Sequence, residues 1–278
     1  MNNFRVNFTT TETSTNCTTQ SFELMDSLDI CGYTISLLFG LPTHSYVIWL
    51  IITATERGVA SEFFNLNLSV CELGVCLASL ISALSFCFFS LSTLKSFLLG
   101  CVITGRPLFQ CLICVERYLA VVHPVTFLKY KPLRYRVICC TAAWITILGS
   151  CFLCLLFSDN LKFALFLSGQ FLLFFSIQLF CVVAVLRALK QSGPGERGRE
   201  KKEENHMKKR AFNIILITTV SMVILNVPRI ITGFSEIRTS DNTPTTWFTA
   251  LTCFIMAGFV QPVLFLHRTG KLSCLFSS

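Results

Sequence analysis

The chain of 278 residues is 53% hydrophobic and only 14% charged, and it contains 27 Phe residues. Soluble domains carry about 25% charged residues, so this composition excludes an ordinary soluble protein. Of the 23 basic residues behind the net charge of +8, nine lie between Arg187 and Arg210. Positive charge gathered in one short stretch is typical of an inner loop of a membrane protein, and we expect no nucleic-acid partner.

Residues 1–28 come before the first apolar run and predict a glycosylated tail outside the membrane. The segment is rich in Thr, Ser and Asn and lacks the apolar stretch of a cleaved signal peptide. Asn7 and Asn16 each begin an Asn-x-Thr sequon, which is glycosylated only in the secretory pathway. A third sequon, at Asn67, falls inside an apolar run and is taken as a chance match.

Seven long apolar runs predict an all-α membrane protein, a seven-transmembrane helix bundle over residues 29–267. Each run is long enough to cross a hydrocarbon core, which takes about 20 helical residues. The runs cover residues 29–54, 61–87, 92–122, 136–157, 164–188, 210–234 and 246–267. Residues 189–209 predict a flexible, basic inner loop, and residues 268–278 predict a short cytoplasmic helix and tail.

The distribution of loop charges predicts an extracellular amino terminus and a cytoplasmic carboxyl terminus. With this orientation, 16 of the 23 basic residues lie in inner segments and four in outer segments. We therefore expect a multi-pass protein of the plasma membrane. Most of the 15 Cys residues lie within the apolar runs, where Cys behaves as a small hydrophobic residue.

The most specific motif ends the third run, where Glu116-Arg117-Tyr118 is followed by a Val-His-Pro turn. This pattern resembles the signature of rhodopsin-like (class A) G-protein-coupled receptors. Further landmarks in the order of that family are Asn67-Leu68-Ser69-Val70-Cys71-Glu72, Trp144, Asn226-Val227-Pro228 and Gln261-Pro262-Val263-Leu264-Phe265. Two more segments, Gly40-Leu41-Pro42 and His267-Arg268-Thr269-Gly270-Lys271, are similar to the nucleotide- and protease-activated receptor branch.

The resemblance implies a receptor that passes the signal of an extracellular ligand to a heterotrimeric G protein. It implies no enzyme activity, no cofactor and no metal. The activation switch would comprise Glu116, Arg117, Tyr118, Pro262 and Phe265, with Arg117 held in the active state by two tyrosine hydroxyls. Arg117 can also pair with Glu116. The alternative to a signalling role is that the two residues form only a satisfied ion pair at the membrane interface.

Several departures from the family pattern keep a second function open. Val182 and Phe265 occupy the positions of the two tyrosines, and the toggle Trp and the outer disulfide are missing. A receptor-like protein that no longer signals, acting as a decoy, scavenger or partner subunit, is therefore the alternative. A small transporter is the third hypothesis. The Glu-Arg-Tyr triplet and the absence of internal repeats disfavour it.

Two opposite charges inside the apolar runs, Glu72 and Arg106, predict a buried ion pair. A lone charge in the bilayer core costs a few kcal/mol, so such side chains face inward and seek partners. The resemblance places both in the family's sodium pocket, with Arg106 where a hydroxyl residue is usual. We expect Arg106 to replace the ion and pair with Glu72, with Gln261 as a further hydrogen-bond partner. The alternative is that Arg106 binds only backbone carbonyls around Pro107.

The ligand site of the bundle is expected near Leu99 and Ile103 on the third helix. Neither is acidic, which disfavours an amine ligand. Arg229, just after Pro228, is the candidate contact for an anionic ligand. Alternatively, it snorkels to the outer surface or pairs with Glu236.

The inner face is expected to meet the membrane as well as a G protein. Basic residues near the inner surface attract anionic lipids, at about 1 kcal/mol each. The second inner loop contributes Lys129, Lys131, Arg134 and Arg136 to this surface. Cys274, near the end of the chain, is a candidate for palmitoylation.

Overall fold

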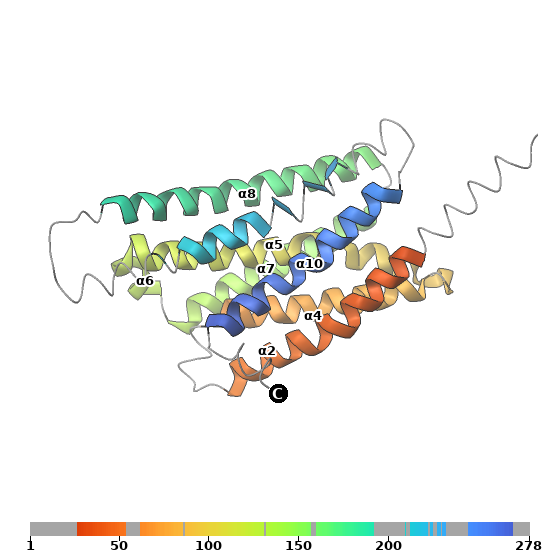
Figure 1. The fold of residues 1–278 in the computed structure, drawn as a ribbon, viewed down its shortest axis with the longest axis horizontal. Helices are drawn as coiled ribbons and strands as arrows, with labels where there is room; N and C mark the ends of the chain where they lie inside the picture. Colours follow the sequence, from red (N-terminus) through yellow and green to blue (C-terminus); the bar gives the residue numbers. More distant parts are fainter. Residues whose placement is uncertain are drawn as a thin grey trace, which may run out of the picture.

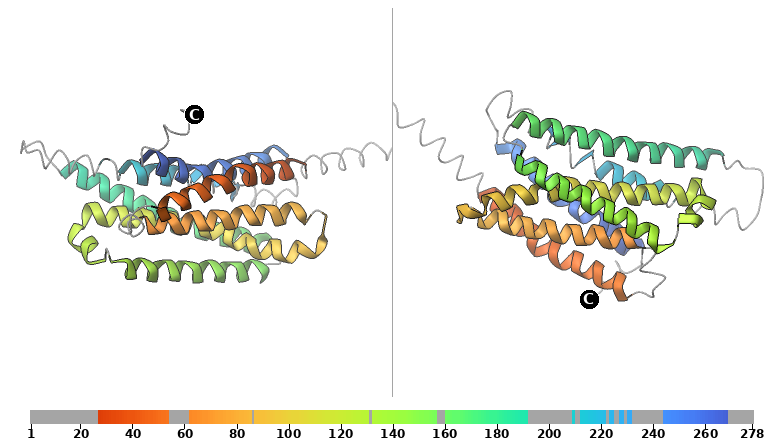
Figure 2. Two further views of the ribbon diagram at one scale, coloured as in Figure 1. Left: turned by 90° about the horizontal axis from the view of Figure 1, so that it is seen from below. Right: turned by 180° about the vertical axis from the view of Figure 1, so that it is seen from behind.

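The computed structural model describes seven apolar helical segments. Described are residues 27–53, 62–85, 87–130, 132–156, 160–191, 209, 212–221, 223–224, 227–228, 230–231 and 244–268. All are helical or lie in turns beside helices, and no strand occurs among them. The helices run along the long axis of the molecule, with α5 in the centre (Figure 1 and Figure 2).

Six of the predicted runs correspond to a helix whose bounds differ from the run by no more than a few residues, whereas the run 210–234 is described as a continuous helix only over Phe212–Ser221. The first span is Ser27–Thr53, which includes the π-helical turn η1 (Ser36–Gly40) and α2 (Leu41–Thr53). The remaining elements are α4 (Phe63–Leu84), η2 (Phe89–Leu91), α5 (Ser92–Val122), α6 (Pro124–Tyr130), α7 (Leu133–Leu156), α8 (Asn160–Gln191), the apolar helix Phe212–Ser221 and α10 (Pro244–Arg268). Five of these helices are long and apolar enough to cross a membrane, and Phe212–Ser221 and Ile255–Leu266 are shorter apolar helices.

Two local features were not predicted. The first is α6, where Pro124 stands at the first helical position, which its fixed backbone angle favours. The second is the π turn η1 within the first span. A π turn widens the helix and changes its backbone hydrogen bonding, and the Cys76 thiol of α4 donates to the Ser36 carbonyl at 3.5 Å.

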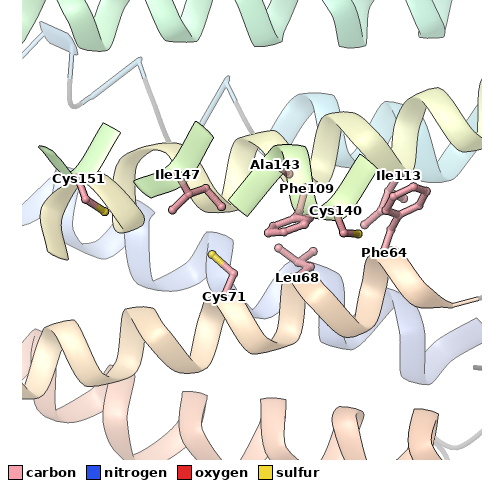
Figure 3. Close-up of a cluster of buried hydrophobic side chains, with 9 residues drawn as sticks. All are labelled: Phe64, Leu68, Cys71, Phe109, Ile113, Cys140, Ala143, Ile147 and Cys151. Carbon is pink, nitrogen blue, oxygen red and sulfur yellow. The ribbon is translucent and has the colours of Figure 1, made fainter. Parts of the chain in front are cut away.

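The core lies between α4, α5 and α7. Figure 3 shows its side chains pointing into the space between these three helices. The cluster consists of Phe64, Leu68, Cys71, Phe109, Ile113, Cys140, Ala143, Ile147 and Cys151. On the outer surfaces, large apolar residues such as Phe39, Ile145 and Phe180 are 60–65% exposed. Helices that are apolar on all sides are typical of membrane spans.

One close approach and one polar cluster fix α5 against its neighbours. A side chain at Gly100 would overlap the backbone of Cys151, so only Gly permits this contact between α5 and α7. One turn further along α5, the hydroxyl oxygens of Thr104 and Ser150 are 2.5 Å apart. The amide nitrogen of Gln170 in α8 donates to the same Thr104 oxygen at 3.0 Å. Three helices therefore meet at a single buried hydroxyl.

Candidate functional site

A buried ion pair joins the middle of α4 to the middle of α5. The Nε atom of Arg106 donates to Oε1 of Glu72 at 2.5 Å, and an Nη atom donates to Oε2 at 2.7 Å. The two side chains are only 3% and 5% exposed. This bidentate geometry uses both carboxylate oxygens and the planar edge of the guanidinium, which suits a charge pair to burial. The pair can neutralise both charges without a bound ion.

α10 closes over the ion pair with small residues. A Cβ atom at Gly258 would lie 3.1 Å from an Nη atom of Arg106 and 3.8 Å from Oε2 of Glu72. The preceding residue, Ala257, is also buried. The guanidinium therefore fills the space in which another residue at position 258 would place its side chain.

The prediction that the amide nitrogen of Gln261 donates a hydrogen bond to the ion pair is wrong. Its Nε2 atom is buried and has no hydrogen-bond partner in the described part of the chain. Glu72 already accepts hydrogen bonds from Arg106 on both oxygens, which reduces its need for another donor. His44 of α2 is also buried near the pair, and its Nδ1 atom has no partner among the described residues.

A second buried ion pair lies at the end of α5 that carries the Glu-Arg-Tyr triplet. Oε1 of Glu116 accepts a hydrogen bond from an Nη atom of Arg136 on α7. The two side chains are 9% and 6% exposed. Arg117 is half-buried and forms no ion pair with Glu116, and its Nε atom has no hydrogen-bond partner among the residues described. The acid of the triplet thus binds a cation on another helix.

Arg136 corrects the sequence prediction for the inner basic residues. It was expected to face anionic lipid, but it lies inside α7 and is 5% exposed. Arg134, two residues earlier, is exposed and lies over the Tyr135 ring, 4.8 Å from its centroid. The lipid-facing role therefore fits Arg134 and not Arg136. The side chains of Lys129 and Lys131 lie outside the described residues.

Tyr118, the last residue of the triplet, contacts His123, which precedes α6, and Phe180 of α8. Its hydroxyl lies 3.0 Å from Nε2 of His123, and its ring packs edge-on against Phe180 at 5.6 Å between centroids. These contacts hold the end of α5 to the turn that follows it.

The positions that the resemblance assigns to tyrosines lie in apolar surroundings. Val182 packs with Cys114, Val185 and Ile215. Phe265 packs with residues of α2, and Pro262 lies buried within α10. Neither Val182 nor Phe265 offers a hydroxyl to Arg117.

Of the remaining predicted site residues, two lie in an apolar cluster and the others lie outside the described residues. Ile103 is buried against Cys154 and Leu167, and Leu99 packs on the same cluster. The positions predicted for anion binding, glycosylation and palmitoylation lie outside the described residues, namely Arg229, Asn7, Asn16 and Cys274.

Two features of the site were not predicted from the sequence. They are the Thr104–Ser150–Gln170 cluster and the ion pair of Arg136 with Glu116. Polar residues inside apolar runs were the available signal for the cluster, because buried hydroxyls and amides need partners. For Arg136 the signal was Glu116, a further acid in an apolar run, which needs a cation.

The chain resembles known receptors over most of its length. The sequence profile of the family described as 7 transmembrane receptor (rhodopsin family) matches residues 44–264. The chain is 24% identical over 230 residues to C-C chemokine receptor type 8 of Homo sapiens, covering 70% of this chain and 60% of that receptor. It is 25% identical over 282 residues to hydroxycarboxylic acid receptor 2 of Rattus norvegicus, covering 88% and 76%.

A further relative is chemokine XC receptor 1 of Homo sapiens, with 26% identity over 195 residues, covering 60% of this chain and 56% of that receptor. The chain thus spans 56–60% of the length of the two human chemokine receptors. By name, these relatives are chemokine and hydroxycarboxylic acid receptors. The nucleotide- and protease-activated branch therefore stays a prediction.

Proposed function

We propose that this chain, which belongs to the rhodopsin family of seven-transmembrane receptors, signals to a heterotrimeric G protein. Membership in this family makes the chain a multi-pass membrane protein with a seven-helix bundle. In the proposal, the Arg117 end of the bundle faces the cytoplasm of the cell, and the amino terminus lies outside. The protein acts at the plasma membrane as a ligand-dependent switch.

The state of Arg117 carries this proposal. Its Nε atom is buried and has no partner in the described part of the chain, and the neighbouring carboxylate of Glu116 accepts a hydrogen bond from Arg136. A guanidinium with unused donors at the end of a helix bundle can bind a carbonyl or carboxylate of a docking protein. The triplet supplies such a group at the place where the resemblance puts G-protein contact.

The test is a panel of G-protein activation sensors read in cells without added ligand. We expect a basal signal that disappears with Arg117→Ala and persists with the control Lys162→Ala, because Lys162 is exposed in the first turn of α8, away from the predicted inner face. Surface expression is measured for every variant. A basal signal that Arg117→Ala leaves intact contradicts the proposal.

A receptor-like protein without signalling is the second candidate, and Val182 and Phe265 favour it. Both side chains are buried in apolar clusters and have no hydroxyl with which to hold a displaced Arg117. A decoy, scavenger or partner subunit would reach the surface and give no signal in any sensor. Silence across the panel at full surface expression therefore selects this function.

For the ligand, we propose a small anionic molecule that contacts Arg229. The apolar cluster around Leu99 and Ile103 supplies a wall with no acidic side chain. One relative is by name a hydroxycarboxylic acid receptor, which supports an acid as ligand. A response to a panel of carboxylic acids should be lost with Arg229→Ala and retained with Arg238→Ala. Equal responses of both variants contradict the Arg229 contact.

We also propose three features that rest mainly on the sequence. Asn7 and Asn16 bear glycans, Cys274 bears a palmitoyl group, and the inner basic segments contact anionic lipid. Substitution of both Asn residues by Gln should abolish the mass shift that a glycosidase causes. Replacement of Cys274 by Ser should abolish incorporation of a palmitate label. An unchanged mass shift or label would contradict the respective assignment.

A further inference from the structure

The Arg117 end of the bundle holds two cations and one carboxylate in close proximity. Glu116 and Arg136 form a buried pair between α5 and α7. The charge of Arg117 acts on Glu116 more strongly than that of Arg136, yet among the described residues Glu116 forms its ion pair with Arg136 and not with Arg117. Two guanidinium groups thus compete for one carboxylate, and the structure shows Arg136 holding it.

Helix geometry explains this choice. Adjacent residues on an α-helix point about 100° apart, so Glu116 and Arg117 do not face the same neighbour. Arg136 lies near the start of α7, where this helix packs against α5. Its side chain reaches the Glu116 carboxylate without a change in either helix, whereas Arg117 would have to fold back along its own helix.

We propose that Arg136 is a positioning residue of the signalling site, which holds the Glu116 carboxylate on α7 and so keeps Arg117 free to bind an acceptor on the G protein. This inference rests on the proposed function and adds a residue that controls it. Arg136 itself makes no contact with the partner. It acts through Glu116, because the carboxylate that hydrogen-bonds Arg136 forms no ion pair with Arg117, although the two charges still act on each other.

Removal of Arg136 would leave a carboxylate buried without a partner, which is costly. The nearest remaining cation is Arg117, and a change of side-chain rotamers brings the two groups together. A self-paired Arg117 must break this pair before it binds another protein. The population that is competent for coupling falls, and the apparent affinity for the partner falls with it.

The first test is the basal G-protein signal per receptor at the surface. We expect Arg136→Gln to lower it roughly fivefold, the lower end of typical coupling effects. Arg136→Lys keeps a cation near Glu116 and should retain most of the signal. The decisive variant is Glu116→Gln with Arg136→Gln, which has no carboxylate to capture Arg117 and should recover the signal. Glu116→Gln also removes the unpaired carboxylate that a purely structural Arg136 would leave, so the signal per surface receptor is compared between variants of equal thermal stability. Failure of the double variant to recover overturns the inference.

The second test does not depend on signalling. Thermal unfolding of the purified protein is measured for Glu116→Gln, Arg117→Gln and both together, first with Arg136 present and then with Arg136→Gln. If Arg136→Gln does not fold, Arg136→Met takes its place, because its apolar chain fills similar space. We expect stronger coupling between positions 116 and 117 when Arg136 is absent than when it is present. Equal coupling in both backgrounds overturns the inference.

The two tests separate the inference from the proposed function. A wild-type chain that is silent in every sensor, both without ligand and with each carboxylic acid of the ligand panel, overturns the G-protein function. The unfolding cycles then decide by themselves whether Arg136 keeps Glu116 away from Arg117.

Discussion

Glu72 and Arg106 neutralise each other in a part of the bundle where both side chains are at least 95% buried. Removal of one partner from a buried pair leaves an uncompensated charge, and the loss of stability is about 3–5 kcal/mol. The pair is therefore a strong constraint between α4 and α5, even though its net contribution relative to two apolar residues can be small.

We expect Glu72→Gln and Arg106→Gln each to reduce surface expression strongly, because each leaves one buried charge. The exchange Glu72→Arg with Arg106→Glu restores neutrality and should recover a large part of the expression. Flow cytometry with an epitope at the amino terminus measures the effect. If the exchange is no better than the single variants, the two side chains do not depend on each other.

Gly258 provides a second residue-scale prediction. A Cβ atom at this position would lie 3.1 Å from the Arg106 guanidinium and would push it from Glu72. The matched control is Gly149→Ala, because a Cβ at Gly149 meets nothing within 4 Å. Both variants gain the same helix propensity, so we expect Gly258→Ala to unfold at the lower temperature. Equal unfolding temperatures would show that the guanidinium has room to move.

The partners of single charges were only partly predictable from the sequence. Glu72 and Arg106 are opposite charges in adjacent apolar runs, which led to their pairing as a prediction. The amide nitrogen of Gln261 does not donate to the pair, whose two carboxylate oxygens both accept from Arg106. Arg136 was assigned to a loop because it stands at the edge of an apolar run, and run edges do not reveal which helix turn packs inward.

At the scale of the helices, α5 is held by contacts that require small or polar side chains. Gly100 allows the backbone of α5 to approach Cys151 of α7, and Thr104 connects the same two helices to α8. Polar side chains that bond across helices are one of the means by which membrane helices associate, at about 0.6–2 kcal/mol each. These contacts position the helix that carries both ion pairs.

We expect Thr104→Val to destabilise the bundle by about 1–3 kcal/mol, because it leaves Ser150 and Gln170 without their shared hydroxyl partner. Thr146→Val is the control, since Thr146 is exposed on α7 and its hydroxyl bonds only its own helix, to Ala142. Thermal unfolding in detergent compares the two. A Thr104 variant as stable as the Thr146 variant would show that the cluster contributes little.

The helices themselves followed from the sequence, and their irregularities did not. Long apolar runs specify α4, α5, α7 and α8, because each must satisfy its backbone hydrogen bonds inside the membrane. The π turn at Ser36–Gly40 coincides with a contact from Cys76 of α4, and the short α6 begins at Pro124. Apolar periodicity carries no signal for either, because the same residues also suit a regular helix or a turn.

In the molecule as a whole, α5 carries two regions that differ in charge. One is the neutralised pair in the centre, and the other is the Glu116–Arg136 pair beside Arg117, whose Nε atom has no hydrogen-bond partner among the described residues. In the proposed receptor, the Arg117 end receives the G protein, so this end must lie in the cytoplasm.

Epitope accessibility tests this orientation most directly. Tags are placed at Met1, in the basic loop after Gly193 and at Ser278, and cells are stained before and after permeabilisation. The account predicts that intact cells stain only for the tag at Met1 and that permeabilised cells stain for all three. Staining of the tags at Met1 and Ser278 on the same side of the membrane would contradict the seven-span receptor.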